Sequence, residues 1–224
     1  MFGSRLRKPA SEYDAIFEEL NALKDEEDRA DASSEADIWR TDGPFDISEV
    51  EIERENVIDL GALIVTHFPG LQLQLLRSPD GEIHTVLAVW KDSALGLSLF
   101  AEATSTDSTD AVKSRLEAFS DQIRAADGEV VWNASGPFGL VLQVKVPVEA
   151  DAAADLGMQV SQVWAVKGPR WVLQGQLLGE QALHPLNAKP TKVFLEFFRN
   201  AVVRRGVEPI PPGGRISLSA PEEE

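Results

Sequence analysis

The chain has 224 residues, of which 43% are hydrophobic and 26% are charged, as in an ordinary globular protein of one large or two small domains. It contains no cysteine, so disulfides, thiolate metal sites and cysteine nucleophiles are excluded. The formal net charge of −16 argues against a nucleic acid partner, because an acidic protein repels the phosphate backbone.

The negative charge is concentrated near the start of the chain. Residues 11–60 hold 18 acids and four bases, whereas residues 61–221 hold 16 acids and 14 bases, so the body is close to neutral. Residues 1–10 are basic but are followed by acids, not by the apolar core of a signal peptide. No apolar run reaches the roughly 18 residues of a membrane span. We expect a cytoplasmic protein with no membrane partner.

Residues 11–24 predict a short amphipathic helix capped by Ser11. Its apolar face contains Tyr13, Ile16, Phe17, Leu20 and Leu23. A helix of this length is marginal alone, so we expect it to dock either on the body or on a partner protein. The acidic, Ala/Ser-rich segment that follows, residues 25–43, is typical of a disordered linker.

The body is predicted to begin with strands. Apolar or alternating runs occupy residues 57–65, 71–76, 83–90 and 95–103. A long helix is expected over residues 109–127, capped by Ser108 or Thr109, with Gly128 ending it in the left-handed conformation.

Further strands and a second helix are predicted in the second half of the body. The expected strands cover residues 129–134, 139–148, 159–166 and 171–178. Residues 190–205 predict the second helix, which Gly206 closes.

The two halves of the body resemble each other, since each contains antiparallel strands followed by one helix. We therefore predict an α+β fold with mainly antiparallel sheets and two long helices, arranged as two pseudo-repeated units, or as two segments that are alike by chance. We expect three parts: an acidic, largely disordered extension over 1–43, a body over 44–208, and a Pro/Gly-rich acidic tail over 209–224.

Catalytic and cofactor motifs are absent from the sequence: there is no G-x-S-x-G, Walker or G-x-G-x-x-G pattern. The three histidines, His67, His84 and His184, lack the spacing of a metal site, so we expect no metal and no cofactor. Paired carboxylates such as Glu51 and Glu53 are interpreted as a solvated charged face.

One basic cluster stands out near the end of the body. Arg199, Arg204 and Arg205, with Arg170 on a hairpin turn, form a candidate anion-binding site, because guanidinium groups bind phosphate through paired hydrogen bonds. The same residues are equally consistent with capping a helix end or with docking the acidic N-terminal segment. The neighbouring Trp171 is either a partner-binding residue or part of the core.

Several stretches together resemble a known family: "MFG" followed by basic residues, an acidic linker, "IDLGALIV", "GPRWVLQGQLLG" and "VVRRGVEPIPP". They are similar to the actinobacterial family designated DUF3710, a domain of unknown function, over essentially the whole chain. The resemblance implies a cytoplasmic bacterial protein without an assigned activity, site or cofactor.

Two functions follow as hypotheses. The first is a non-enzymatic adaptor that binds a protein partner of unknown identity through Tyr13, Ile16, Phe17, Leu20 and Trp171. The second is a binder of, or enzyme acting on, a phosphorylated small molecule or nucleotide at the basic cluster.

Overall fold

The computed structural model describes residues 42–52, 56–147, 158–186, 188 and 191–221. Its larger sheet contains β4 (Gln72–Arg77), β5 (Ile83–Trp90), β6 (Ser93–Ala101), β7 (Glu129–Gly136), β8 (Gly139–Pro147), β9 (Met158–Lys167) and β10 (Trp171–Gly179). Its smaller sheet contains β1 (Phe45–Asp46), β2 (Val57–Asp59), β3 (Leu63–Thr66) and β11 (Val202–Val203). The helices in this part of the chain are α2 (Ser108–Ala125), α3 (Lys192–Arg199) and the short 3-10 helix η2 (Glu180–Leu183).

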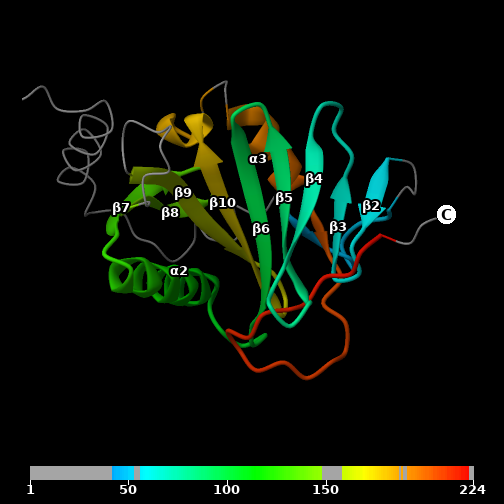
Figure 1. The fold of residues 1–224 in the computed structure, drawn as a ribbon. Helices are drawn as coiled ribbons and strands as arrows, with labels where there is room; N and C mark the ends of the chain where they lie inside the picture. Colours follow the sequence, from blue (N-terminus) through cyan, green and yellow to red (C-terminus); the bar gives the residue numbers. More distant parts are fainter. Residues whose placement is uncertain (1–41, 53–55, 148–157, 187, 189–190, 222–224) are drawn as a thin grey trace, which may run out of the picture.

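The seven strands of the larger sheet are all antiparallel and follow the order β4-β5-β6-β10-β9-β8-β7 (Figure 1). The smaller sheet has the order β1-β11-β3-β2 and contains one parallel pair, β1 with β11. The predicted α+β class with mainly antiparallel strands is confirmed. No helix in the described ranges combines the length and apolar character needed to cross a membrane.

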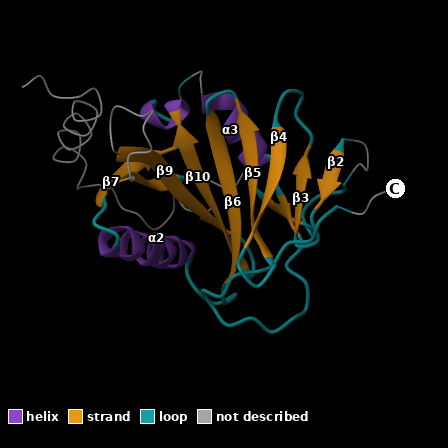
Figure 2. Ribbon diagram, in the orientation of Figure 1, coloured by secondary structure: helices purple, strands orange, loops and turns teal. Residues whose placement is uncertain are grey.

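The two α-helices cover opposite faces of the larger sheet (Figure 2). Helix α2 buries Ala111 and Leu116 against apolar side chains of β8, β9 and β10, which form one hydrophobic cluster with Phe100 of β6. Helix α3 buries Phe194, Phe197 and Phe198 on the other face, in a larger cluster that includes the smaller sheet. Alternate residues of each central strand therefore point into different cores.

The predicted ends of the first helix need correction. The N-cap is Asp107, whose carboxylate accepts a hydrogen bond from the Thr109 amide at 2.8 Å, and not Ser108 or Thr109. The left-handed residue after the helix is Asp127, with φ of 57°, and not Gly128. Gly128 is required for space instead, because a Cβ there would lie 2.5 Å from the Ile123 side chain.

The second predicted helix is shorter than expected. Helix α3 ends at Arg199, and the predicted continuation contains β11, which lies between β1 and β3. Val202 and Val203 pair with Ile64 and Leu63, as suits β-branched side chains on a buried sheet.

The single strand predicted over residues 57–65 is in fact a hairpin of β2 and β3. Gly61, with φ of 77°, lies in the turn between them, in a region that side chains disfavour.

The predicted two-unit repeat has a counterpart in the pairing of one hairpin, but not in the positions of the helices. Ala88 of β5 pairs with Leu95 of β6, and 78 positions later in the sequence Val166 of β9 pairs with Leu173 of β10. A true repeat would relate β6 and β10 by a two-fold axis perpendicular to the sheet. The helices that follow these strands, α2 and α3, would then lie on the same face, yet they lie on opposite faces. Helix α2 packs mainly on β7, β8, β9 and β10 and reaches β6 near the end of that strand, at Phe100.

The predicted tail packs on the body. Ile216 and Leu218 are buried in the larger cluster, and their amides donate hydrogen bonds to the carbonyls of Leu99 (2.9 Å) and Ile83 (2.7 Å). Arg215 lies opposite Phe100 of β6, which belongs to the α2 side of the sheet. The tail thus brings a basic side chain to the end of β6.

Candidate functional site

Two of the four predicted arginines have acidic partners of their own. The Arg204 Nη1 atom lies 2.9 and 3.1 Å from the two carboxylate oxygens of Asp59. The Arg199 Nη1 atom lies 3.7 Å from Glu196, and its guanidinium lies 5.5 Å from the centre of the Phe138 ring. These charges are balanced locally.

The other two, Arg170 and Arg205, lie near each other. Burial lowers the pKa of the Arg205 guanidinium, the positive charge of Arg170 lowers it further, and Glu208 opposes this effect. Arg170 donates to the Gly206 carbonyl at 3.0 Å and Arg205 to the Glu208 carbonyl at 3.1 Å. Arg170 therefore holds the loop after β11 against the β9–β10 turn, whereas the Arg205 hydrogen bond lies within that loop and leaves the buried Nε and Nη1 atoms of Arg205 without partners.

Trp171 belongs to the core. Its ring is fully buried, and its Nε1 donates a hydrogen bond of 2.8 Å to a carboxylate oxygen of Asp46, joining β10 to β1. Gly168 leaves room for this ring, because a Cβ there would lie 2.1 Å from it. The Gly-Pro-Arg-Trp hairpin is thus a packing element. The other predicted partner-binding residues, Tyr13, Ile16, Phe17 and Leu20, lie outside the described residues.

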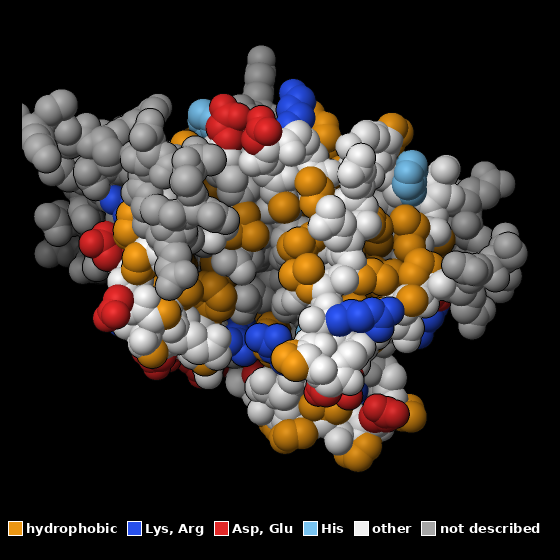
Figure 3. Space-filling view, viewed as in Figure 1, with side chains coloured by type: hydrophobic (Ala, Val, Ile, Leu, Met, Phe, Trp, Pro, Cys, Tyr) orange, Lys and Arg blue, Asp and Glu red, His pale blue; other side chains and the backbone are white. Residues whose placement is uncertain are grey.

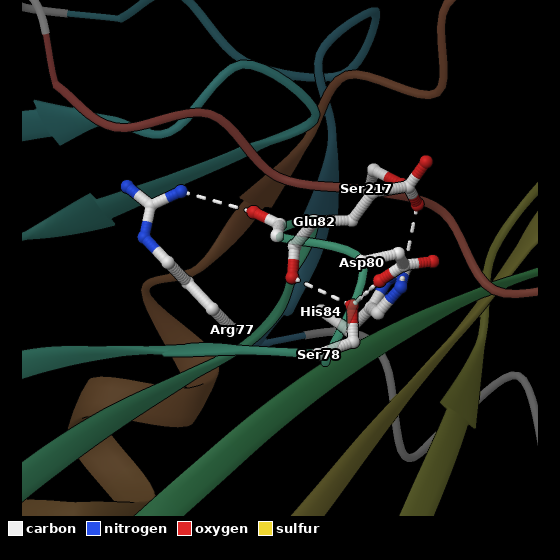
Figure 4. Close-up of polar contacts among 7 residues, drawn as sticks. Arg77, Ser78, Asp80, Glu82, His84 and Ser217 are labelled. Carbon is white, nitrogen blue, oxygen red and sulfur yellow. Dashed lines mark hydrogen bonds and ion pairs between the residues drawn. The ribbon is translucent and has the colours of Figure 1, made fainter.

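A polar cluster at the β4–β5 turn contains a serine, a carboxylate and a histidine (Figure 4). Ser217 Oγ donates to Glu82 Oε2 at 2.8 Å, and His84 Nε2 lies 3.3 Å from the same oxygen. The carboxylate lies between the other two groups, whereas activation of a serine requires the histidine in that position. The cluster therefore ties the tail to the turn and does not form a nucleophilic triad.

The turn itself is held by its own side chains. Arg77 donates to the Gly81 carbonyl at 3.0 Å, and the single hydroxyl hydrogen of Ser78 lies within reach of both the Asp80 carboxylate and the Glu82 carbonyl. The Ser78 hydrogen bond is the main reason why the pKa of Asp80 is lowered.

The best candidate site is a pair of arginines on one aromatic ring. The guanidinium carbon of Arg115, from α2, lies 4.1 Å from the centre of the Phe100 ring, and that of Arg215, from the tail, lies 5.8 Å from it. We call these two residues the arginine pair. Phe100 is buried and holds both cations by cation–π attraction.

The charge of the arginine pair is not balanced within the described ranges. Neither residue takes part in any ion pair found there. The Nε atom of Arg115 is buried and has no hydrogen-bond partner. Burial lowers the pKa of the Arg115 guanidinium, and the positive charge of Arg215 lowers it further. An anion placed between the two guanidinium groups would accept a hydrogen bond from Arg115 and would offset the repulsion between the two positive charges.

Polar side chains of the larger sheet lie beside the arginine pair. Ser98 is two residues from Phe100 on β6, on the same face; its hydroxyl is 2.7 Å from that of Thr85 on β5, and its neighbour on β10 is Gln174. Gln174 is only 6% exposed, and its Oε1 atom has no partner. Figure 3 shows this side of the molecule, with Lys and Arg side chains between the α2 region and the lower end of the strands.

Sequence reasoning did not identify the arginine pair. Arg115 lies three residues after Val112 and four before Phe119, on the apolar face of the helix, where a charge is a recognisable anomaly. Arg215 precedes the apolar residue Ile216 in a segment interpreted as a tail, and it lies 100 positions after Arg115 in the sequence. Only the path of the tail along β6 brings them together.

No group of three or more His, Asp or Glu side chains suited to a metal ion occurs among the residues that the structure describes. His67 and His84 lie in different parts of the fold, the first after β3 of the smaller sheet and the second in β5 of the larger.

Comparison with known proteins identifies the family. A family model described as "Protein of unknown function (DUF3710)" matches residues 43–224, which is more than half of the chain, so the chain belongs to this family. No curated protein matches the sequence.

Proposed function

We propose that this DUF3710 member binds a small anionic molecule, whose phosphate or carboxylate group lies between Arg115 and Arg215. The observation that carries the proposal is the unbalanced arginine pair on Phe100, with a buried Nε that has no partner. The proposal keeps the ligand class predicted from the basic cluster but moves the site to residues that the sequence did not single out.

The physical argument concerns the energy of the pair without a ligand. Two like charges repel each other, and a buried donor without a partner loses its hydration without compensation. Folded proteins keep such an arrangement where function requires it, since binding residues are commonly not optimal for stability. Guanidinium groups form paired hydrogen bonds to phosphate or carboxylate oxygens, so an anion supplies the missing partner and the missing charge.

The test is a thermal-shift measurement on the full chain with inorganic phosphate, pyrophosphate and citrate. A ligand at about 100 times its Kd stabilises the folded state by about 2.7 kcal/mol and raises the Tm accordingly. We expect the shift to disappear in Arg115→Gln and in Arg215→Gln.

Arg124→Gln is the matched control, because Arg124 lies on the same helix but is exposed and paired with Asp121 at 3.6 Å. It should respond as the unmodified protein does. If both pair variants still respond as the control does, the arginine pair is not the site. A loss of response only in Arg170→Gln and Arg205→Gln would place the site at the originally predicted cluster.

The remaining predictions concern partners and origin. The adaptor role depends on the helix predicted over residues 11–24, outside the described ranges, so partner binding through that segment stays a proposal. An actinobacterial origin and a cytoplasmic location likewise remain proposals, supported by the composition and the family resemblance.

A further inference from the structure

We propose that the ligand of the arginine pair is a phosphorylated sugar, alone or as part of a nucleotide, and that one of its hydroxyl groups donates a hydrogen bond to Gln174 Oε1. This inference rests on the proposed function, because it assigns the part of the ligand that extends from the anion along the sheet. It makes Gln174, Ser98 and Thr85 the residues that distinguish a sugar phosphate from a bare anion.

The strand register places these side chains next to the arginine pair. Phe100, which both arginines contact, is paired with Val172, and the next residues on the same face are Ser98 and Gln174, also paired. Residues two apart on a strand are separated by about 7 Å, and paired residues on neighbouring strands by about 5 Å. A phosphate at the pair and a sugar ring beside it would span this distance.

Gln174 supplies the observation that points to a ligand donor. The residue is only 6% exposed, and its Oε1 has no hydrogen-bond partner. A buried carbonyl oxygen without a partner costs about 1–3 kcal/mol, and most such groups in folded proteins have a partner. In the orientation that the structure gives the Gln174 amide, the missing partner is a donor, which a carboxylate or an unprotonated phosphate oxygen cannot supply.

The hydroxyl pair extends the same pattern. Thr85 Oγ1 and Ser98 Oγ share one hydrogen bond of 2.7 Å, which leaves a second hydroxyl hydrogen and several lone pairs available. Adjacent sugar hydroxyls both donate and accept hydrogen bonds. They therefore suit a surface that presents an acceptor at Gln174 and hydroxyl groups, which also donate and accept, at Ser98 and Thr85. An apolar ligand would leave these groups without partners, at a cost in binding free energy.

The experiment is isothermal titration calorimetry on the full chain with inorganic phosphate, ribose 5-phosphate and adenosine 5′-monophosphate. We expect ribose 5-phosphate to bind at least tenfold more tightly than inorganic phosphate. The variant Gln174→Met, which keeps the size of the side chain but removes the acceptor, should lose this difference and keep its affinity for inorganic phosphate. The retained phosphate binding also shows that the variant is folded.

The control variant is Gln176→Met, on the same strand and face, because the Gln176 amide already donates to Ser161 Oγ at 3.4 Å. It should keep the tenfold difference, and Ser98→Ala should lose part of it. A nucleotide as the natural ligand is indicated if the adenosine compound binds more tightly than ribose 5-phosphate, and a free sugar phosphate if it binds less tightly.

Two results would overturn the inference while leaving the proposed function in place. One is equal affinity for inorganic phosphate and ribose 5-phosphate in the unmodified protein. The other is an unchanged tenfold difference in Gln174→Met. If none of the three compounds binds, anion binding itself is contradicted, so the two failures are distinguishable.

Discussion

Replacing a residue of the proposed site should make the protein without ligand more stable. We expect Arg115→Met to raise the free energy of unfolding by about 1 kcal/mol at low salt, which corresponds to a Tm increase of about 2–4 °C for a chain of this size. Methionine keeps an unbranched apolar stem against Phe100 but removes the charge and the unpartnered Nε.

The magnitude follows from the geometry of the pair. The guanidinium carbons lie 4.1 and 5.8 Å from the Phe100 centre, so they are at most 9.9 Å apart, the sum of the two distances. At that separation the repulsion is about 1.7 kcal/mol for an effective dielectric constant of about 20. Arg215 is exposed and Arg115 only partly buried, so solvent screening reduces this energy to roughly 1 kcal/mol or less.

Two further contributions have opposite signs. Removing the unpartnered Nε recovers about 1–3 kcal/mol, whereas losing the cation–π contact with Phe100 costs about 0.5–2 kcal/mol. These two contributions largely cancel, so the expected gain in stability comes from removing the repulsion between Arg115 and Arg215.

The assay is urea denaturation at two salt concentrations, with Arg124→Met as the control on the same helix. The gain in Arg115→Met should decrease as salt rises, because salt screens the repulsion that the substitution removes. The control should change stability by less than about 0.5 kcal/mol. A loss of 1 kcal/mol or more in Arg115→Met, or a salt dependence equal to that of the control, would refute the reasoning.

Three other predictions concern the scaffold. Trp171→Phe should lower the free energy of unfolding by about 1.5–3 kcal/mol in urea denaturation, because it removes the hydrogen bond to the Asp46 carboxylate; a loss below about 0.5 kcal/mol would contradict this role. Phe198→Ala should cost about 3–5 kcal/mol, because the ring packs against Phe138 and Trp164, whereas Val207→Ala, at a side chain that is 93% exposed, should change stability by less than about 0.5 kcal/mol in the same assay. Ser78→Ala should raise the pKa of Asp80 in an NMR titration, because it removes the hydrogen bond that lowers this pKa. In the unmodified protein the ionised carboxylate adds stability above its unfolded pKa, and this stability is lost as the pH falls through the lower folded pKa; the variant should show less of it. An unchanged pKa would exclude the hydrogen bond as the cause.

Local pattern was sufficient to predict most of the secondary structure. The alternation in residues 71–76 and the apolar stripe of residues 109–127 correspond closely to β4 and α2, because strand and helix periods are properties of neighbouring residues. Val202 and Val203 were assigned to a helix because the apolar periodicity continues past Arg199. Their actual partners, Ile64 and Leu63, are distant in the sequence, and pairing with them makes Val202 and Val203 a strand despite the helical periodicity.

The candidate site was not predictable for the same reason. The basic cluster stands out in the sequence because three of its four arginines lie within seven residues, but Arg199 and Arg204 have acidic partners of their own. Arg115 and Arg215 become neighbours only because the tail pairs with β6 and α2 packs on the same sheet. The unpartnered Oε1 of Gln174 is likewise a property of the folded chain.

The most direct measurement is an NMR titration of the arginine Nε–Hε signals with ribose 5-phosphate, on the full chain. Binding at the arginine pair predicts that the signals of Arg115 and Arg215 shift together and saturate, while those of Arg199 and Arg204 stay in place. Shifts confined to Arg170 and Arg205, or no saturable shift at Arg115, would contradict the account.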